Sequence, residues 1–329
     1  MNGMRLKPSS LQRGTTIVEI MVTLAIGLFI TLAVAVAYVA SRTTATAVDS
    51  QSRMNEAGKQ ALDFLAREVQ MAGFYPASVT DPVQPSLRGR YSNIKGQPAY
   101  QGGIFGCDNA PFLPSAGGCG AVVAGAPDSL VVNYFVPTSP RDVGVANASV
   151  GRDCLNQPLA TDPDNAARAA AGLPLLLSNR FTATASGYDS AVGAVNVRVD
   201  TLALACNGNG VALPTDNYAQ LYEGVAQLVF RYAVHDFSSG ETPQRFFTAT
   251  EVSAMPVMQE RNGWQRVSGV SICVLMRSLV PSRTASQGAG GATYTDCSGN
   301  AVSPGANDRF FYQRFARVVA VRNQLTGLQ

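Results

Sequence analysis

Residues 13–20 read Arg-Gly-Thr-Thr-Ile-Val-Glu-Ile, and the uncharged apolar run Ile20–Ser41 continues from them. A helix needs roughly 20 apolar residues to cross about 30 Å of hydrocarbon, so this run predicts one membrane-spanning helix. Arg5, Lys7 and Arg13 precede the run, whereas residues of both signs follow it. Because basic flanks stay on the cytoplasmic side, we expect a cytoplasmic N-terminus and an exported remainder.

Glu19 is an ionisable residue inside this apolar segment. Such a group costs on the order of 2.5 to 3.5 kcal/mol on insertion scales, and its presence indicates a functional role. Cleavage between Gly14 and Thr15 would create an amino group close to Glu19 in the sequence. In a stack of such helices, the amine of one subunit could neutralise the carboxylate of the next.

The order of basic leader, Gly14, apolar helix and Glu19 resembles the class III signal of type IV pilins and pseudopilins. The resemblance implies that a prepilin peptidase cuts after Gly14 and methylates the new N-terminus at Thr15. Thr15 departs from the family, which usually has Phe at this position.

Two other signals are compatible with the same apolar run. A plain signal anchor would leave Gly14 and Glu19 unexplained. A secretory signal fits the small residues at 35–37, Ala-Val-Ala, but would place Glu19 inside its apolar core.

The helix is expected to continue beyond the membrane segment, because no proline occurs between Ser9 and Tyr75. Apolar residues recur there at steps of three or four: Met54, Ala57, Ala61, Leu65, Val69 and Ala72. We predict one helix from Thr15 to about Ala72, ended by Gly73. Its outer half is amphipathic, so one stripe should pack on a globular domain.

Residues 61–74, Ala-Leu-Asp-Phe-Leu-Ala-Arg-Glu-Val-Gln-Met-Ala-Gly-Phe, resemble the helix end of the PilW family of minor pilins. Residues 315–323 are similar to the closing strand of that family, whereas the middle of the chain shares only its composition. The resemblance implies a pilin-like α+β fold and a role in initiating and building type IV pili, with twitching motility and adhesion. It implies no enzymatic activity and no cofactor.

The resemblance also implies partners and a location. The partners are other minor pilins, the major pilin, the prepilin peptidase, an inner-membrane assembly platform and often a large tip adhesin. The chain would be a single-pass inner-membrane prepilin with a periplasmic domain, and later part of a pilus. A type II secretion pseudopilin of the large J type, which shares the signal, helix and sheet, is the closest alternative.

A membrane-anchored secreted enzyme is a more distant alternative. His235 is the only histidine and has no nucleophile context, and the motifs of serine hydrolases, zinc proteases and phosphate-binding loops are missing. Removing the leader leaves about as many basic as acidic residues, so nucleic acid is an unfavourable partner. Asp162, Asp164 and Asn165 do not have the spacing of a calcium loop and predict a solvated turn.

The boundaries that follow are a leader at 1–14, a membrane half at 15–41, an amphipathic half at 42–74 and a globular domain at 75–329. In that domain we predict loops from Pro76 to Pro127, a strand at Ser129–Val136, and irregular chain from Thr138 to Ser178 apart from a short helix at Asn165–Ala171.

Alternating apolar residues predict later strands near 195–200, 227–235, 270–276 and 310–323, which argue for an antiparallel sheet. Trp264 is expected at a hairpin tip, and a glycine-rich stretch at 288–291 is expected to be a flexible loop.

Six cysteines follow the membrane segment, which favours disulfides in an exported chain. Cys107 and Cys119 flank one Pro/Gly-rich loop, and Cys273 and Cys297 flank another. Local pairing would leave Cys154 with Cys206, although six cysteines permit 15 connectivities. A zinc site is the alternative, but close ligand spacings are missing.

Overall fold

The computed structural model describes residues 14, 16–76, 98–137, 151–192, 195–210, 215–235, 243, 245–281, 293–305 and 308–324. Thr15, most of the leader and the stretch at 288–291 lie outside these ranges. The chain divides by its contacts into two units, Met1–Asp49 and Ser50–Gln329, which are described separately.

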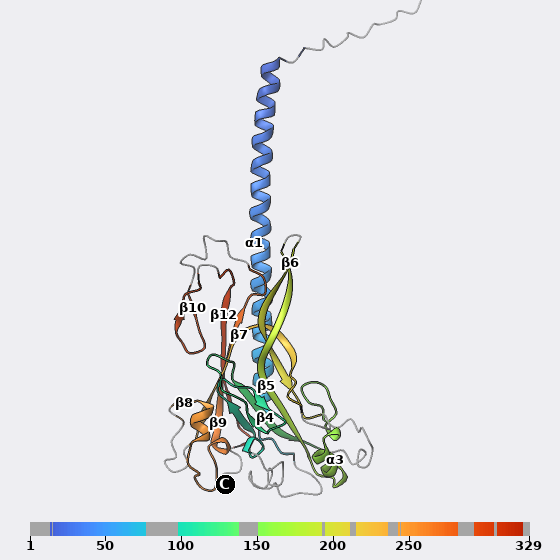
Figure 1. The fold of residues 1–329 in the computed structure, drawn as a ribbon, viewed down its shortest axis with the longest axis vertical. Helices are drawn as coiled ribbons and strands as arrows, with labels where there is room; N and C mark the ends of the chain where they lie inside the picture. The colour runs from blue at the N-terminus through green and yellow to red at the C-terminus, as the bar shows by residue number, and fades with distance from the viewer. Residues whose placement is uncertain are drawn as a thin grey trace, which may run out of the picture. The chain divides into compact units, whose positions relative to one another are not determined.

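The first unit contains the N-terminal part of helix α1, whose bounds are Ile17–Met71. Its apolar window has a mean hydropathy of 2.6, and none of that window is buried. By length and composition α1 can cross a membrane, as predicted (Figure 1).

The second unit contains the rest of α1, an antiparallel sheet and several short elements. The eight strands of the sheet are β1 (Ile104–Cys107), β4 (Ser129–Val136), β5 (Leu175–Val192), β6 (Val195–Asn207), β7 (Ala219–Val234), β8 (Phe246–Phe247), β9 (Val267–Arg277) and β12 (Tyr312–Ala320). Their order is β1-β4-β5-β6-β7-β9-β12, with β8 paired to β7. The predicted α+β class is confirmed.

Two small hairpins and five short helical segments complete the described structure. The hairpins pair β2 (Phe112–Leu113) with β3 (Gly118–Cys119) and β10 (Tyr294–Thr295) with β11 (Ala301–Val302). The helical segments are η1 (Pro98–Tyr100), η2 (Leu159–Thr161), α3 (Pro163–Ala170), α4 (Ala249–Ser253) and η3 (Trp264–Arg266). The expectation of a solvated turn at Asp162, Asp164 and Asn165 was wrong: Asp162 and Asn165 are buried, and Asp162 caps α3 by accepting the backbone N–H groups of Asp164 and Asn165.

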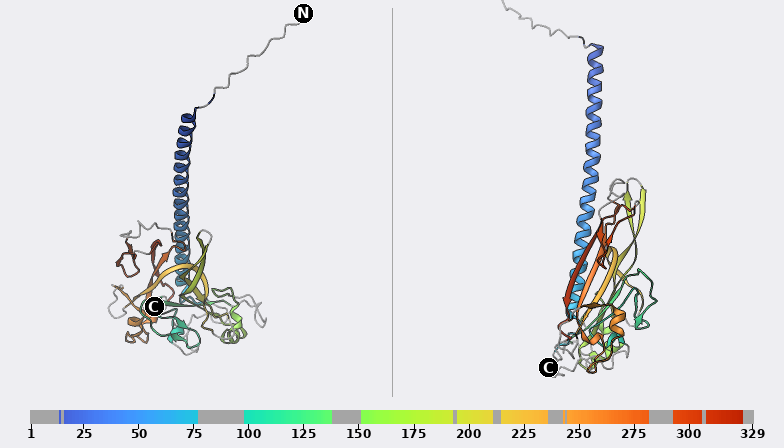
Figure 2. Two further views of the ribbon diagram at one scale, coloured as in Figure 1. Left: turned by 45° about the horizontal axis from the view of Figure 1, so that its top comes forward. Right: turned by 90° about the vertical axis from the view of Figure 1, so that its left-hand side faces the viewer.

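The C-terminal part of α1 packs along one face of the sheet (Figure 2). The predicted stripe is its buried face: Met54, Ala61, Leu65, Val69 and Ala72 are buried, and Ala57 is partly buried. Phe64 adds an edge-on contact with Phe181 of β5, with ring centroids 5.6 Å apart. Burial of such side chains contributes about 25 cal/mol per Å² of apolar surface, so this contact stabilises the whole unit.

Gly73 ends the helix, as its position after the apolar stripe predicts. It has a φ of +76°, a left-handed conformation that favours glycine. Its N–H donates to the carbonyl of Asn133 at 2.9 Å, and the Phe135 N–H donates to the carbonyl of Phe74 at 2.8 Å. The end of α1 is therefore fixed to β4.

The strand predictions were right in part. Ser129–Val136 is a strand with those bounds, and the alternating residues Leu228, Phe230, Tyr232 and Val234 are buried. The loop prediction missed β1, and β5 was not predicted: only its first residues lie in the stretch that was expected to be irregular. Much of β5 consists of Thr, Ala, Ser and Gly without apolar alternation, and it becomes a strand because β4 and β6 pair with it on both sides.

The prediction for Trp264 was wrong. Trp264 is 4% exposed and begins η3 rather than a hairpin tip. Its ring centroid lies 4.9 Å from those of Phe105 and Tyr232, and its Nε1–H donates to Ser253 Oγ at 3.1 Å. The aromatic contacts come from strands distant in sequence, which a local pattern does not show.

Three disulfides are present in the second unit. They join Cys107 to Cys119, Cys154 to Cys206, and Cys273 to Cys297, the pairs that local spacing suggested. The first and third close loops beside β1 and β9, and the second ties the segment before α3 to the end of β6.

We predict that Gly58→Ala destabilises the protein. A Cβ at Gly58 would collide with the buried ring of Phe315 on β12. The change should cost about 1–3 kcal/mol through overpacking, whereas Gly→Ala inside an unobstructed helix gains about 0.5–1 kcal/mol. Denaturant unfolding of the full chain in detergent measures the difference, and adding Phe315→Leu should recover part of the loss. A stabilised Gly58→Ala variant would show that the close approach does not matter.

Candidate functional site

The N-terminal end of α1 contains the residues that the sequence singled out. Gly14 is exposed, and nothing lies within 4 Å of where its Cβ would be. Glu19 lies in the first turn of α1, and its N–H donates to Thr16 Oγ1 at 3.3 Å and to the Thr16 carbonyl at 3.0 Å. Among the described residues, none forms an ion pair with Glu19.

Thr16 has a role that sequence reasoning missed. Its hydroxyl accepts the N–H of the residue three positions later, as in the first half of a capping box. The Thr-x-x-Glu spacing before an apolar run was the signal that could have found it.

Glu19 also places a negative charge near a helix N-terminus, where the helix dipole favours it.

The apolar side chains of the first unit are exposed all around the helix. Ile17, Leu24, Leu28 and Phe29 are each more than two thirds exposed. A surface of this kind requires lipid or other apolar helices as its environment. The charge of Glu19 is therefore the feature that distinguishes this segment from a simple anchor.

A second carboxyl group, Glu68, lies where α1 meets the sheet. Its Oε2 accepts Asn179 Nδ2 at 2.9 Å, and Asn179 is oriented by its own Oδ1, which accepts the Cys154 N–H at 3.0 Å. Burial raises the pKa of Glu68, partly offset by the Asn179 hydrogen bond and by Arg67. The sequence did not single out Glu68, because a charged residue on an amphipathic helix normally faces water.

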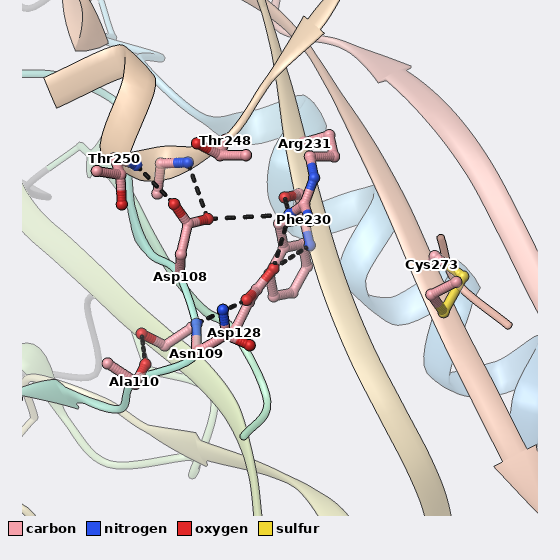
Figure 3. Close-up of polar contacts among 12 residues, drawn as sticks. Asp108, Asn109, Ala110, Asp128, Phe230, Arg231, Thr248, Thr250 and Cys273 are labelled. Atoms are coloured by element: carbon pink, nitrogen blue, oxygen red, sulfur yellow. Dashed lines mark hydrogen bonds and ion pairs between the residues drawn. A yellow bond between two sulfur atoms is a disulfide. The ribbon is translucent and has the colours of Figure 1, made fainter. Parts of the chain in front are cut away.

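A polar network joins β1, β7 and α4 (Figure 3). Asp108 accepts the N–H groups of Ala249 and Thr250 at 2.9 and 2.7 Å, and so anchors the start of α4. Asp128 accepts the N–H of Phe230 at 3.0 Å, and Arg231 Nη1 lies 3.1 Å from Asp128 and 3.8 Å from Asp108.

Burial raises the pKa of Asp128, against the lowering effect of the Asn109 and Phe230 N–H groups and of Arg231. Among the described residues, the carboxylates of Asp108 and Asp128 contact backbone N–H groups and Arg231. These contacts hold the strands and α4 in place.

A hollow of about 490 Å³ lies against the middle of β6 and β7 and the end of β9. Stacked rings of Tyr294 and Tyr312, with centroids 4.4 Å apart, form part of its lining together with Arg277 and Asp200. Arg277 Nη2 donates to the Asp200 carbonyl at 2.6 Å. The lining contains neither histidine nor cysteine, and within the described ranges no group of three His, Cys, Asp or Glu side chains could hold a metal ion.

Residues 190–323 match the model of the PilW family, described as type IV pilus-assembly protein W. The predicted PilW resemblance is confirmed over this segment. The matched residues include β7, β9 and β12, so the match is independent of the N-terminal signal, which all pilin-like proteins share.

Two further comparisons add context. The type IV-like pilin TTHA1219 from Thermus thermophilus is similar to this chain at 11% identity with a TM-score of 0.36, covering 83% of this chain and 98% of that one. No curated relative matches the chain.

We predict that Glu68 makes the stability of the second unit depend on pH. Folding raises the pKa of this carboxyl group above its ordinary value of 4.5. The free energy of unfolding is therefore highest below pH 4.5, and it falls as pH rises through the pKa of the folded state. Glu68→Gln keeps an acceptor for Asn179 without the charge. We therefore expect the free energy of unfolding of the Glu68→Gln variant, relative to that of the unmodified chain, to increase as pH rises above about 4.5.

Unfolding of the full chain in detergent, followed by Trp264 fluorescence at a series of pH values, measures this gain. Glu56→Gln is the matched control, because Glu56 is exposed on the same helix. Parallel pH profiles for Glu68→Gln and the unmodified chain would contradict the assignment.

Proposed function

We propose that this chain is a minor pilin of the PilW type. It is inserted as a prepilin, cut after Gly14 and methylated at Thr15, and it takes part in the complex at the base or tip that initiates a type IV pilus. The PilW match at residues 190–323 is the observation that carries the proposal. Gly14, the apolar helix and Glu19 support it independently.

The mechanism is assembly and not catalysis. The exposed apolar surface of α1 exchanges lipid for the helices of neighbouring subunits. An isolated charge in such surroundings is strongly disfavoured, so Glu19 docks beside the terminal amine of a neighbour. Cleavage creates that amine, and the uncut chain stays a membrane monomer.

The proposal includes a location and partners. The prepilin crosses the inner membrane once with its sheet domain in the periplasm, and the mature subunit enters the pilus at the cell surface. Its partners are the prepilin peptidase, other minor pilins, the major pilin, the assembly platform and a tip adhesin. Twitching motility and adhesion are the processes it serves.

Glu19→Ala should leave membrane insertion and cleavage intact but reduce piliation and twitching. Leaving one member of a buried ion pair without its partner costs about 3–5 kcal/mol, so pilus number should fall by about tenfold or more. Glu19→Gln, which keeps the size and removes the charge, should show the same defect. Electron microscopy counts pili, and normal piliation in both variants would refute the docking role.

Gly14→Val should block cleavage and keep the full chain in the inner membrane. N-terminal sequencing of the unmodified mature protein should begin at Thr15. Secretion assays on the same strains separate the pilus from the type II secretion alternative: lost secretion with normal pili would assign the chain to secretion.

A further inference from the structure

We propose that the outer edge of β12 is a docking site for an extended acidic strand of a different pilus subunit, which adds to the sheet beside β12. The identification of the partner as a pilus subunit rests on the proposed function. The strand-binding property itself rests on the geometry of the edge, its groove and its charges.

The backbone groups that face outward follow from two printed hydrogen bonds. Ser278 N–H donates to the Phe311 carbonyl at 2.9 Å, and Val321 N–H donates to the Ser268 carbonyl at 2.8 Å. The register between β12 and β9 has no shift. Because residues of an antiparallel pair alternate between bonded and non-bonded positions, the odd-numbered residues of β12 face β9. The outward N–H and C=O groups are those of residues 312, 314, 316, 318 and 320.

β12 is the last strand of the sheet. The β10–β11 hairpin lies beside it, with Tyr294 stacked on Tyr312, and β1 at the other end has η1, η3 and α4 against it. In the part of the chain that the structure describes, no backbone hydrogen bond joins Arg314, Ala316, Val318 or Ala320 to another segment beyond the sheet. Natural edge strands are commonly blunted by proline or bulges, and β12 has neither.

A groove runs beside the open edge. It has a volume of about 470 Å³ and is lined by Gln70 of α1 and by residues of β12 and the segment after it: Arg317, Val318, Val319, Ala320 and Arg322. Val318 is 59% exposed although it lies in the middle of the strand. A strand added to a sheet lies about 4.8 Å from its neighbour, so a partner strand would occupy this space.

The charges along the edge select an acidic partner. Arg314 and Arg322 are exposed and, among the described residues, have no ion-pair partner, whereas Arg317 pairs with Asp63 of α1 at 2.9 Å. A carboxylate near each end of the incoming strand would complement these two cations. A second copy of this chain fits poorly: when two β12 edges pair antiparallel around Val318, Arg314 of one faces Arg322 of the other.

The test measures binding of a defined peptide to the full chain in detergent micelles. The probe is a fluorescent peptide of alternating Val and Thr with Glu at both ends, spaced to reach Arg314 and Arg322. It should bind about tenfold or more tightly than the same peptide with N-methylated amides on its pairing edge, because each lost hydrogen bond costs about 1 kcal/mol. A Lys-ended peptide should also bind more weakly.

Val318→Pro is the decisive variant. It removes an outward N–H without removing a hydrogen bond to β9, since Val318 opposes Ser271 at a non-bonded position. Val318→Thr, which keeps the N–H and the β-branch, is the matched control and should bind normally. Arg314→Glu combined with Arg322→Glu should reverse the preference toward the Lys-ended peptide, whereas Arg152→Glu, in the loop before β5, should not.

Several outcomes would overturn the proposal. The first is that the N-methylated peptide binds as tightly as the unmethylated one. The second is that a Val318→Pro variant with native circular dichroism binds the peptide as tightly as the unmodified chain. The third is that the full chain self-associates and Val318→Pro abolishes this self-association. In cells, Val318→Pro should be cut normally at Gly14 yet reduce pilus number. Normal piliation would show that the partner of β12 is not a pilus subunit. If the unmodified chain is not cleaved, the proposed function is wrong, but the peptide-binding result is still valid.

Discussion

The packing of the C-terminal part of α1 on the sheet is the contact on which the second unit depends. Gly58 allows the helix to approach Phe315 of β12. Leu65 and Val69 of the helix are fully buried. Without the helix, the apolar face formed by β5, β7 and β9 would be exposed to water. In the first unit the same helix exposes a mostly apolar surface, which lipid or other apolar helices can cover.

The two parts of α1 make different kinds of contact. The amphipathic part packs within the chain, and its half-buried carboxyl group, Glu68, is held by Asn179. The first part makes no such contact among the described residues, and Glu19 lies near the end where the proposed cleavage would create an amine. The proposed assembly would satisfy these interactions between subunits.

The sheet is similarly asymmetric. One end, at β1, is fixed by the Asp108, Asp128 and Arg231 network and by neighbouring short helices. The other end, at β12, has regular pairing on one side only and arginines near both ends. A sheet whose two ends differ in this way could accept a further strand at β12, as the proposed docking requires.

The sequence alone determined the long helix, its buried stripe and the later alternating strands, because these depend on local periodicity. It also suggested the disulfide pairs from local loops. It did not predict β1, β5, the burial of Trp264 or the environment of Glu68. Only the tertiary structure decided these, since each depends on partners far apart in the chain: β5 is stabilised by two neighbouring strands, and Glu68 is half-buried against the sheet that Asn179 belongs to.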